Sequence, residues 1–203
     1  MKQSNISIVL GITGGIGSGK STVSGILKEK GAVIIDADLI SKEVVEPGQK
    51  ALEELTETFG TDILDDWGQL NRKKLAGIVF NDSEKLQRLN SILHKYVTER
   101  IKNNVEEQLI NKTNIIVIDA PIPVKSGFID LCQQVWTISA DREVRIQRIM
   151  ERNGMTYEEA VARINSQLDE QEYIRLADVV INNNFDYSHL EKEVEYQLSR
   201  LLG

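Results

Sequence analysis

The chain has 203 residues, enough for one α/β domain with an inserted segment, and 41% of them are hydrophobic and 27% charged. A net charge of −7 and a pI of about 5.0 argue against nucleic acid as the main partner, because nucleic-acid binding needs a basic surface. Cys132 is the single cysteine, so no disulfide can form within the chain, and no apolar run is long enough to span a membrane. We therefore expect a cytoplasmic protein that acts without a membrane.

The first predicted elements are a strand over residues 8–12, a glycine-rich loop, and a helix over residues 21–30. Residues 14–21 fit the phosphate-binding motif G-x-x-x-x-G-K-[ST], and a strand before it and a helix after it are the context that this motif needs. Glycines let successive backbone N–H groups approach phosphate oxygens, and the helix N-terminus adds partial positive charge. Lys20 can reach the β- and γ-phosphates, and the Ser21 hydroxyl can bind Mg²⁺. The residues expected to bind a nucleoside triphosphate are Gly15, Ile16, Gly17, Ser18, Gly19, Lys20, Ser21 and Thr22.

A second predicted strand, residues 32–35, ends in Asp36-Ala37-Asp38. Ligands bind beyond the carboxyl ends of parallel strands, so two carboxylates at that edge suit metal or proton chemistry. If the strand continues, its alternation places both on the same side. The alternative is a solvated turn or a helix cap, with Asp38 capping the next helix. Position alone leaves both interpretations open.

Residues 39–112 have a helical pattern, interrupted by turns at 47–48 and 65–68, and residues 85–109 form one long helix or two. The turn at 65–68 spells the GTPase pattern D-x-x-G, but it follows no strand, and the chain has no N-K-x-D sequence. A helical insertion beside a phosphate-binding core commonly holds a second substrate. Its candidate residues are Arg72, Arg88 and His94, although such side chains more often lie at a surface, and we expect His94 to be partly buried.

A third predicted strand, residues 115–119, is apolar up to its last residue and therefore indicates an interior strand covered on both faces. Asp119 ends it and resembles the acid that helps to hold Mg²⁺ in nucleotide-binding folds. We therefore expect Ser21 to bind magnesium, with Asp119 as the candidate second ligand.

After a fourth strand at residues 135–139, a helix over 141–152 carries Arg145, Arg148 and Arg152 on one face. A capping box, Thr156-x-x-Glu159, begins the next helix, which carries Arg163. We interpret this hairpin as a lid that closes over phosphates, with a solvated charged face as the alternative.

A fifth strand at 178–182 and a final helix capped by Ser188 complete the chain. The pattern predicts an α/β fold of the P-loop NTPase type, a five-stranded parallel sheet flanked by helices. Residues 1–203 form a single domain, with a core at 1–38, 113–143 and 177–203, a helical acceptor-binding insertion at 39–112, and a lid at 144–176.

The sequence resembles the dephospho-CoA kinase family. Residues 11–22 are close to the opening of that family, and more specific markers follow in family order over nearly the whole chain. These markers are residues 35–38, 44–48, 70–72, 89–94, 147–154 and 177–183.

The resemblance implies ATP-dependent phosphorylation of the ribose 3′-hydroxyl of dephospho-CoA, which gives CoA and ADP in the last step of CoA biosynthesis. It implies Asp38 as the base or the orienting group for the 3′-hydroxyl, acting with Lys20 and Arg148, and Arg72 and His94 as acceptor contacts. Arg148 and Arg152 would bind the ATP phosphates. The implied partners are ATP with Mg²⁺ and dephospho-CoA, with neither nucleic acid nor membrane, for a monomer or small homo-oligomer.

The sequence departs from the family at residues 121–127, where Lys125 stands in place of an acid next to the expected acceptor site. Two alternatives remain open. One is another small-molecule kinase of this architecture, such as a nucleoside or nucleotide monophosphate kinase. The other is a nucleotide-dependent switch or a binding module without catalysis, which only the altered segment supports.

Overall fold

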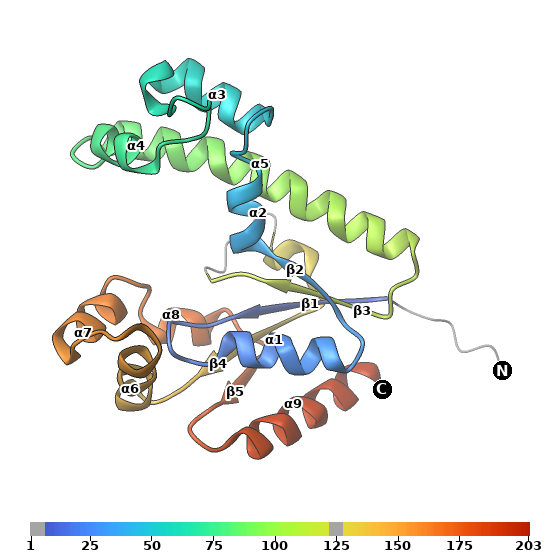
Figure 1. Cartoon of the computed structure of the whole chain (residues 1–203). Coiled ribbons are helices and arrows are strands. Elements are labelled where there is room, and N and C mark those ends of the chain that lie inside the picture. The colour runs from blue at the N-terminus through green and yellow to red at the C-terminus, as the bar shows by residue number, and fades with distance from the viewer. Residues whose placement is uncertain (1–6, 122–127) are drawn as a thin grey trace. The chain divides into compact units, whose positions relative to one another are not determined.

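A computed structural model describes residues 7–121 and 128–203, and within them five strands form one sheet (Figure 1). The strands lie in the order β2-β3-β1-β4-β5. β1 is parallel to both β3 and β4, and β4 is parallel to β5. Their bounds are β1 Ile8–Thr13, β2 Val33–Asp36, β3 Ile115–Asp119, β4 Gln134–Ser139 and β5 Val179–Asn182. The predicted parallel sheet is confirmed.

The register places the ends of the inner strands side by side. Ile12 pairs with Asp119, and Thr13 pairs with Thr137. The glycine-rich loop therefore leaves the sheet next to the carboxyl ends of β3 and β4. This edge is where a parallel sheet binds its ligands.

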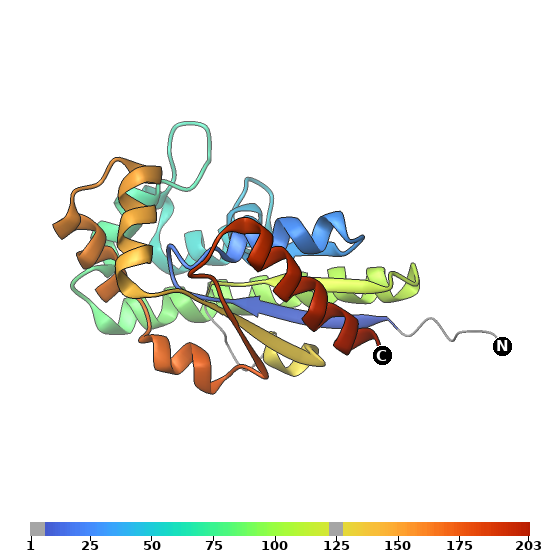
Figure 2. The ribbon, with the colours of Figure 1, turned by 90° about the horizontal axis from the view of Figure 1, so that it is seen from below.

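One face of the sheet is covered by α1 (Lys20–Glu29) and α9 (Tyr187–Leu202). Both helices lie below the strands in Figure 1, and α9 crosses in front of them in Figure 2. Apolar side chains at alternate strand positions, such as Leu10, Ile12 and Trp136, pack against these helices and are fully buried. This core anchors α1, and with it the helix N-terminus that follows the loop.

The opposite face is covered in part by α8 (Glu170–Arg175) and by the segment around η2 (Ile129–Leu131). Thr137 points to this face, and its hydroxyl donates to the carbonyl of Tyr173 at 3.0 Å. Gly11 gives room to Phe128 and Cys132, since an added Cβ would lie 2.9 Å from Phe128 Cζ and from Cys132 Sγ. The sequence pattern does not predict α8 as a separate helix, because its residues fall within the expected lid at 144–176.

The predicted hairpin consists of α6 (Arg142–Asn153) and α7 (Tyr157–Asn165). The predicted capping box is confirmed, because Thr156 and Glu159 each accept from the backbone N–H of the other. Apolar side chains of the two helices form a small core of their own, from Ile146, Ile149, Ala160 and Ile164. The two helices therefore pack against each other through an apolar face of their own.

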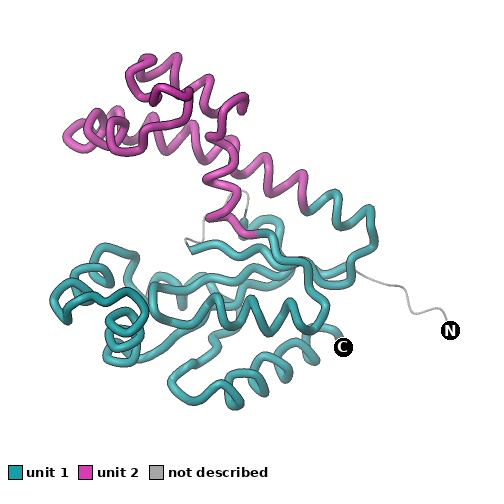
Figure 3. Tube along the Cα trace, in the orientation of Figure 1, with its two compact units in different colours: residues 1–35, 105–203 teal, residues 36–104 magenta. Residues whose placement is uncertain are grey.

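The chain divides into two compact units, one within residues 1–35 and 105–203 and one of residues 36–104 (Figure 3). The second unit overlaps the expected insertion at 39–112. Its elements are α2 Ala37–Glu43, α3 Lys50–Phe59, η1 Thr61–Ile63, α4 Arg72–Val79 and the larger part of α5 Ser83–Ile110. Residues 85–109 belong to one helix, not two. Asp65 accepts from the N–H groups of Trp67 and Gln69, which confirms a turn at 65–68.

The cap of the final helix differs from the expected one. The final helix begins at Tyr187, and its cap is Asp186, whose carboxylate accepts from His189 N at 2.9 Å, not Ser188. In the part of the chain that the structure describes, no helix combines the length and apolar character needed to cross a membrane.

Candidate active site

The loop between β1 and α1 has the backbone form that phosphate binding requires. Gly17 and Gly19 have φ angles of 79° and 97°, which favour glycine. A Cβ at Gly19 would collide with Asn183 Nδ2, and a Cβ at Gly17 would lie 2.8 Å from the Arg145 carbonyl. Among the described residues no side chain caps α1 at Gly19, so its N-terminus is available to an anion.

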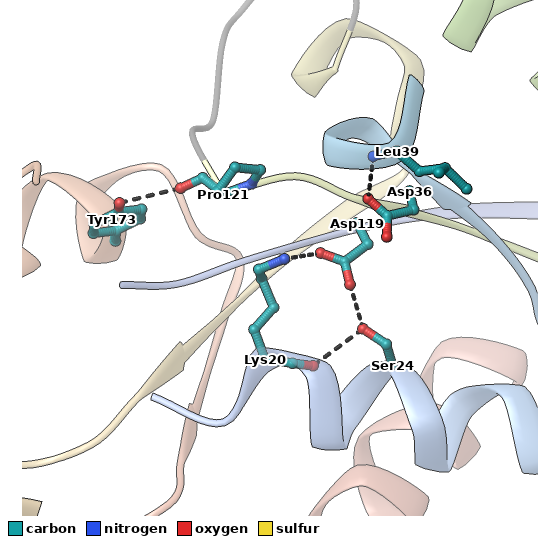
Figure 4. A network of polar contacts seen from close by, with 7 residues as sticks. All are labelled: Lys20, Ser24, Asp36, Leu39, Asp119, Pro121 and Tyr173. Atoms are coloured by element: carbon teal, nitrogen blue, oxygen red, sulfur yellow. Dashed lines mark hydrogen bonds and ion pairs between the residues drawn. The ribbon is translucent and has the colours of Figure 1, made fainter. Parts of the chain in front are cut away.

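Lys20 forms an ion pair with Asp119 (Figure 4). The pair is largely buried, with 19% of the Lys20 side chain and 9% of the Asp119 side chain exposed. The Ser24 hydroxyl donates to the other carboxylate oxygen of Asp119, and it also lies 3.1 Å from the Lys20 carbonyl. Asp119 therefore joins the end of β3 to the first turns of α1, and it balances the charge of Lys20.

The hairpin arginines contact the loop in different ways. The Arg148 guanidinium donates to the carbonyls of Gly17 at 3.3 Å, Ser18 at 3.4 Å and Asn183 at 2.9 Å. Arg145 is buried, and its Nε donates to the Ile16 carbonyl at 2.9 Å. Arg152 is exposed and donates to Asn153 Oδ1 at 3.1 Å. The structure thus brings Arg148 to the loop and leaves Arg152 in solvent.

Asn183 completes the support of the loop from the end of β5. Its side-chain amide donates to the Ser18 carbonyl at 2.7 Å, and its backbone N–H donates to the Ser139 carbonyl at 2.8 Å. Within the described residues, the buried hydroxyls of Thr13 and Ser18 have no hydrogen-bond partner. Buried polar groups are normally paired, so two unpaired hydroxyls at this edge are consistent with a site that awaits a polar ligand.

The two acids after β2 have different roles. Asp36 ends the strand and caps α2, because its carboxylate accepts from Leu39 N at 3.0 Å (Figure 4). Asp38 lies in the first turn of α2 and is exposed. Of the two interpretations left open, the helix cap is present, but the cap is Asp36 and not Asp38. The strand ends at Asp36, so it does not place both acids on one side by alternation.

Arg72 and His94 both lie in the second unit. Arg72 is the first residue of α4, which Asn71 caps by accepting from Lys74 N at 3.0 Å. His94 lies on α5, and its side chain is exposed, so its expected partial burial was wrong. The altered segment with Lys125 falls in residues 122–127, outside the described part of the chain.

Sequence reasoning missed Ser24, Asn183 and Gln167 as residues of this site. Ser24 lies one helical turn after Lys20, a spacing that places both on one side of α1. Asn183 directly follows β5, the same position relative to its strand that drew attention to Asp119 on β3. Nothing in the local sequence indicates the partner of Gln167, whose side chain accepts from the N–H of Ile16 at 2.7 Å.

Three comparisons with known proteins agree. The dephospho-CoA kinase family profile matches residues 8–188. A dephospho-CoA kinase of Lactobacillus johnsonii is 43% identical over 192 residues, which cover 95% of this chain and 97% of that protein. A crystal structure from Thermus thermophilus superposes with a TM-score of 0.78 at 31% identity, over 97% of this chain and 99% of that one. Dephospho-CoA kinase from Campylobacter jejuni gives 0.69 at 28% identity, over 97% and 98% of the two chains.

Proposed function

The chain belongs to the dephospho-CoA kinase family, and from this premise we infer that it phosphorylates dephospho-CoA with ATP in the biosynthesis of coenzyme A. The structural observation that supports the use of ATP is the phosphate-binding loop, with Lys20 at the start of a helix whose N-terminus no described side chain caps. We propose the ribose 3′-hydroxyl as the acceptor group, as the resemblance implies.

The loop and its lysine would bind and stabilise the transferring phosphoryl group. The amides of residues 15–22 provide donors, and Lys20 would turn from Asp119 toward the β- and γ-phosphates. Arg148 already lies on the loop, and Arg152 would reach the phosphates from the exposed side of α6. Closure of the hairpin would exclude water, which otherwise would receive the phosphoryl group.

The residues present fit a magnesium ion. Its preferred ligands are hard oxygens, and Ser21 and Asp119 would provide a hydroxyl and a carboxylate at the nucleotide. Asp119 is 7% exposed, and Lys20 already balances its charge. Magnesium bound with ATP would neutralise phosphate charge.

Asp38 would act as the base in an in-line transfer. Its exposed carboxylate can accept a hydrogen bond from the acceptor hydroxyl and then take its proton. Arg72 and His94 would contact the acceptor from the insertion, because a guanidinium and an imidazole suit its phosphate groups. We further propose a cytoplasmic enzyme that is a monomer or a small homo-oligomer.

The test is release of ADP from ATP in the presence of Mg²⁺, with dephospho-CoA, AMP, adenosine or no acceptor. ADP released only with dephospho-CoA, with an equal amount of CoA formed, is the expected result. Transfer to AMP or adenosine instead would assign the chain to another small-molecule kinase. Bound ATP with no transfer to any acceptor would favour a switch or binding module.

A further inference from the structure

Every part of Ile16, in the middle of the phosphate-binding loop, is held by the hairpin and the segment after it. The Ile16 carbonyl accepts from Arg145 Nε at 2.9 Å, and the Ile16 N–H donates to Gln167 Oε1 at 2.7 Å. Its side chain packs against the small apolar core of α6 and α7. The donor, the acceptor and the apolar side chain of one loop residue are thus all bound by residues 145–167.

We propose that Arg145 and Gln167 are positioning residues, which hold Ile16 so that the loop keeps its phosphate-binding form before ATP arrives. The hairpin would then support the loop from behind, in addition to any role as a lid. The test of this inference by KM values rests on the proposed function, whereas its tests by ATP binding and by hydrogen exchange at Ile16 do not.

The composition of the loop explains why Ile16 is the place to hold it. Gly15 and Gly17 flank Ile16, and glycines allow the backbone many conformations. A loop that is already ordered does not lose this freedom on binding, so its affinity for the ligand is higher. Bonds to both the N–H and the C=O of the residue between the glycines fix the orientation of two successive peptide groups.

Arg145 is placed to act on the loop backbone rather than on a phosphate. Its side chain is 7% exposed, and its guanidinium fills the space where a Cβ of Gly15 would lie. Burial lowers the pKa of Arg145, and the Glu170 carboxylate acts in the opposite direction. Glu170 is itself held by the Ser139 hydroxyl, so the buried cation has an ordered counter-charge.

Gln167 offers the cleaner test, because its side chain is neutral and provides only an acceptor to Ile16. Gln167→Leu removes the acceptor at similar size, whereas Gln167→Glu keeps an oxygen at the same place. Gln147→Leu is the matched control, since the Gln147 amide on α6 is exposed and donates to Glu151 Oε1 at 2.9 Å. The full chain is used for all variants.

The readouts are the KM values for ATP and dephospho-CoA, the Kd for ATP without acceptor, and hydrogen exchange at the Ile16 amide by NMR. We expect Gln167→Leu to weaken ATP binding about tenfold and to speed exchange at Ile16 by at least about tenfold, as the loss of one hydrogen bond implies. The KM for dephospho-CoA should change less than about twofold, within the size of effects at uncoupled sites. Gln147→Leu should match the wild type, and Gln167→Glu should keep the slow exchange at Ile16 because it keeps an acceptor oxygen.

A lower melting temperature without a change in ATP affinity would reduce Gln167 to a fold contact and overturn the proposal. So would unchanged exchange at Ile16 in Gln167→Leu. If Gln167→Leu does not fold, Arg145→Met is judged by the same readouts, with Arg142→Met as its exposed control. A wild-type chain that binds ATP but does not phosphorylate dephospho-CoA would refute the proposed function only, because Kd and exchange still test the loop.

Discussion

The cations that lie at the phosphate-binding loop and the residues proposed to act on the acceptor are held very differently. Lys20, Arg145 and Arg148 are all bonded to protein partners, and each is buried or partly buried. Asp38, Arg72 and His94, proposed to act on the acceptor, are all exposed. The cations at the loop are therefore held by protein contacts, whereas the side chains proposed to act on the acceptor lie in solvent.

The largest effect is expected at the phosphate-binding loop. Lys20→Ala removes the charge that would stabilise the transferring group and leaves Asp119 without its cation, so kcat should fall about 10³-fold. Lys28→Ala, an exposed lysine on the same helix, is the control and should keep full activity. Steady-state ADP release measures both, and a Lys20→Ala variant within about tenfold of wild type would contradict a catalytic role.

The next effect tests the proposed base. Asp38→Asn keeps the size of the side chain but cannot take a proton, so kcat should fall about 10²- to 10⁴-fold while the Kd for ATP is unchanged. Asp36→Asn keeps the cap of α2, since asparagine caps as well as aspartate, and should transfer normally. Calorimetry for ATP and a coupled assay for ADP separate binding from transfer. Near wild-type turnover of Asp38→Asn would remove Asp38 from the mechanism.

A smaller effect is expected from an acceptor contact. Arg72→Ala should raise the KM for dephospho-CoA about tenfold, as the loss of one charge-assisted hydrogen bond implies. The KM for ATP should not move. Lys73→Ala, the exposed neighbour on α4, controls for loss of charge in the same helix. Equal effects of both variants would indicate general charge attraction rather than a specific contact.

The smallest effect concerns Cys132, in the unit of residues 1–35 and 105–203. Burial raises its thiol pKa to about 12, so iodoacetamide should label it slowly at pH 8 in the native protein and rapidly in urea. The raised pKa contributes stability below the unfolded-state value of about 8.5, and this contribution is lost as pH rises from there toward about 12. Urea midpoints at pH 8 and pH 10.5, compared with Cys132→Ala, should show it. A pH-dependence identical in the two proteins would contradict this burial effect.

Local patterns predicted the sheet and the loop well. The strand after residue 114 was found because its residues are apolar without a break, and the structure places it inside the sheet, with every residue buried. The loop was found because its spacing and its flanking elements are both specified by short stretches of sequence. The capping box at Thr156 was confirmed for the same reason.

The sequence predictions fail where two neighbouring residues could each cap a helix, or where a residue's partner is distant in the sequence. At the start of α2 and of α9, two good capping residues lie two positions apart: Asp36 and Asp38, and Asp186 and Ser188. The sequence alone does not show at which of the two the helix begins. The exposure of His94 depends on the rotation of α5, a helix of mixed polarity. Gln167 was missed because its partner, Ile16, is 151 residues away, and no periodicity encodes such a contact.

The bond from Asn183 to Ser18 has a consequence for synthesis. The two residues are 165 positions apart, so the ribosome produces the loop long before the amide that supports it. At about 5–20 residues per second, the interval is on the order of ten seconds. During this time the emerging chain lacks the contacts from residues 145–183 to its glycine-rich loop, and under the positioning role proposed above it would not yet bind the nucleotide tightly. ATP affinity would then report that nearly the whole polypeptide has been made and has closed its sheet.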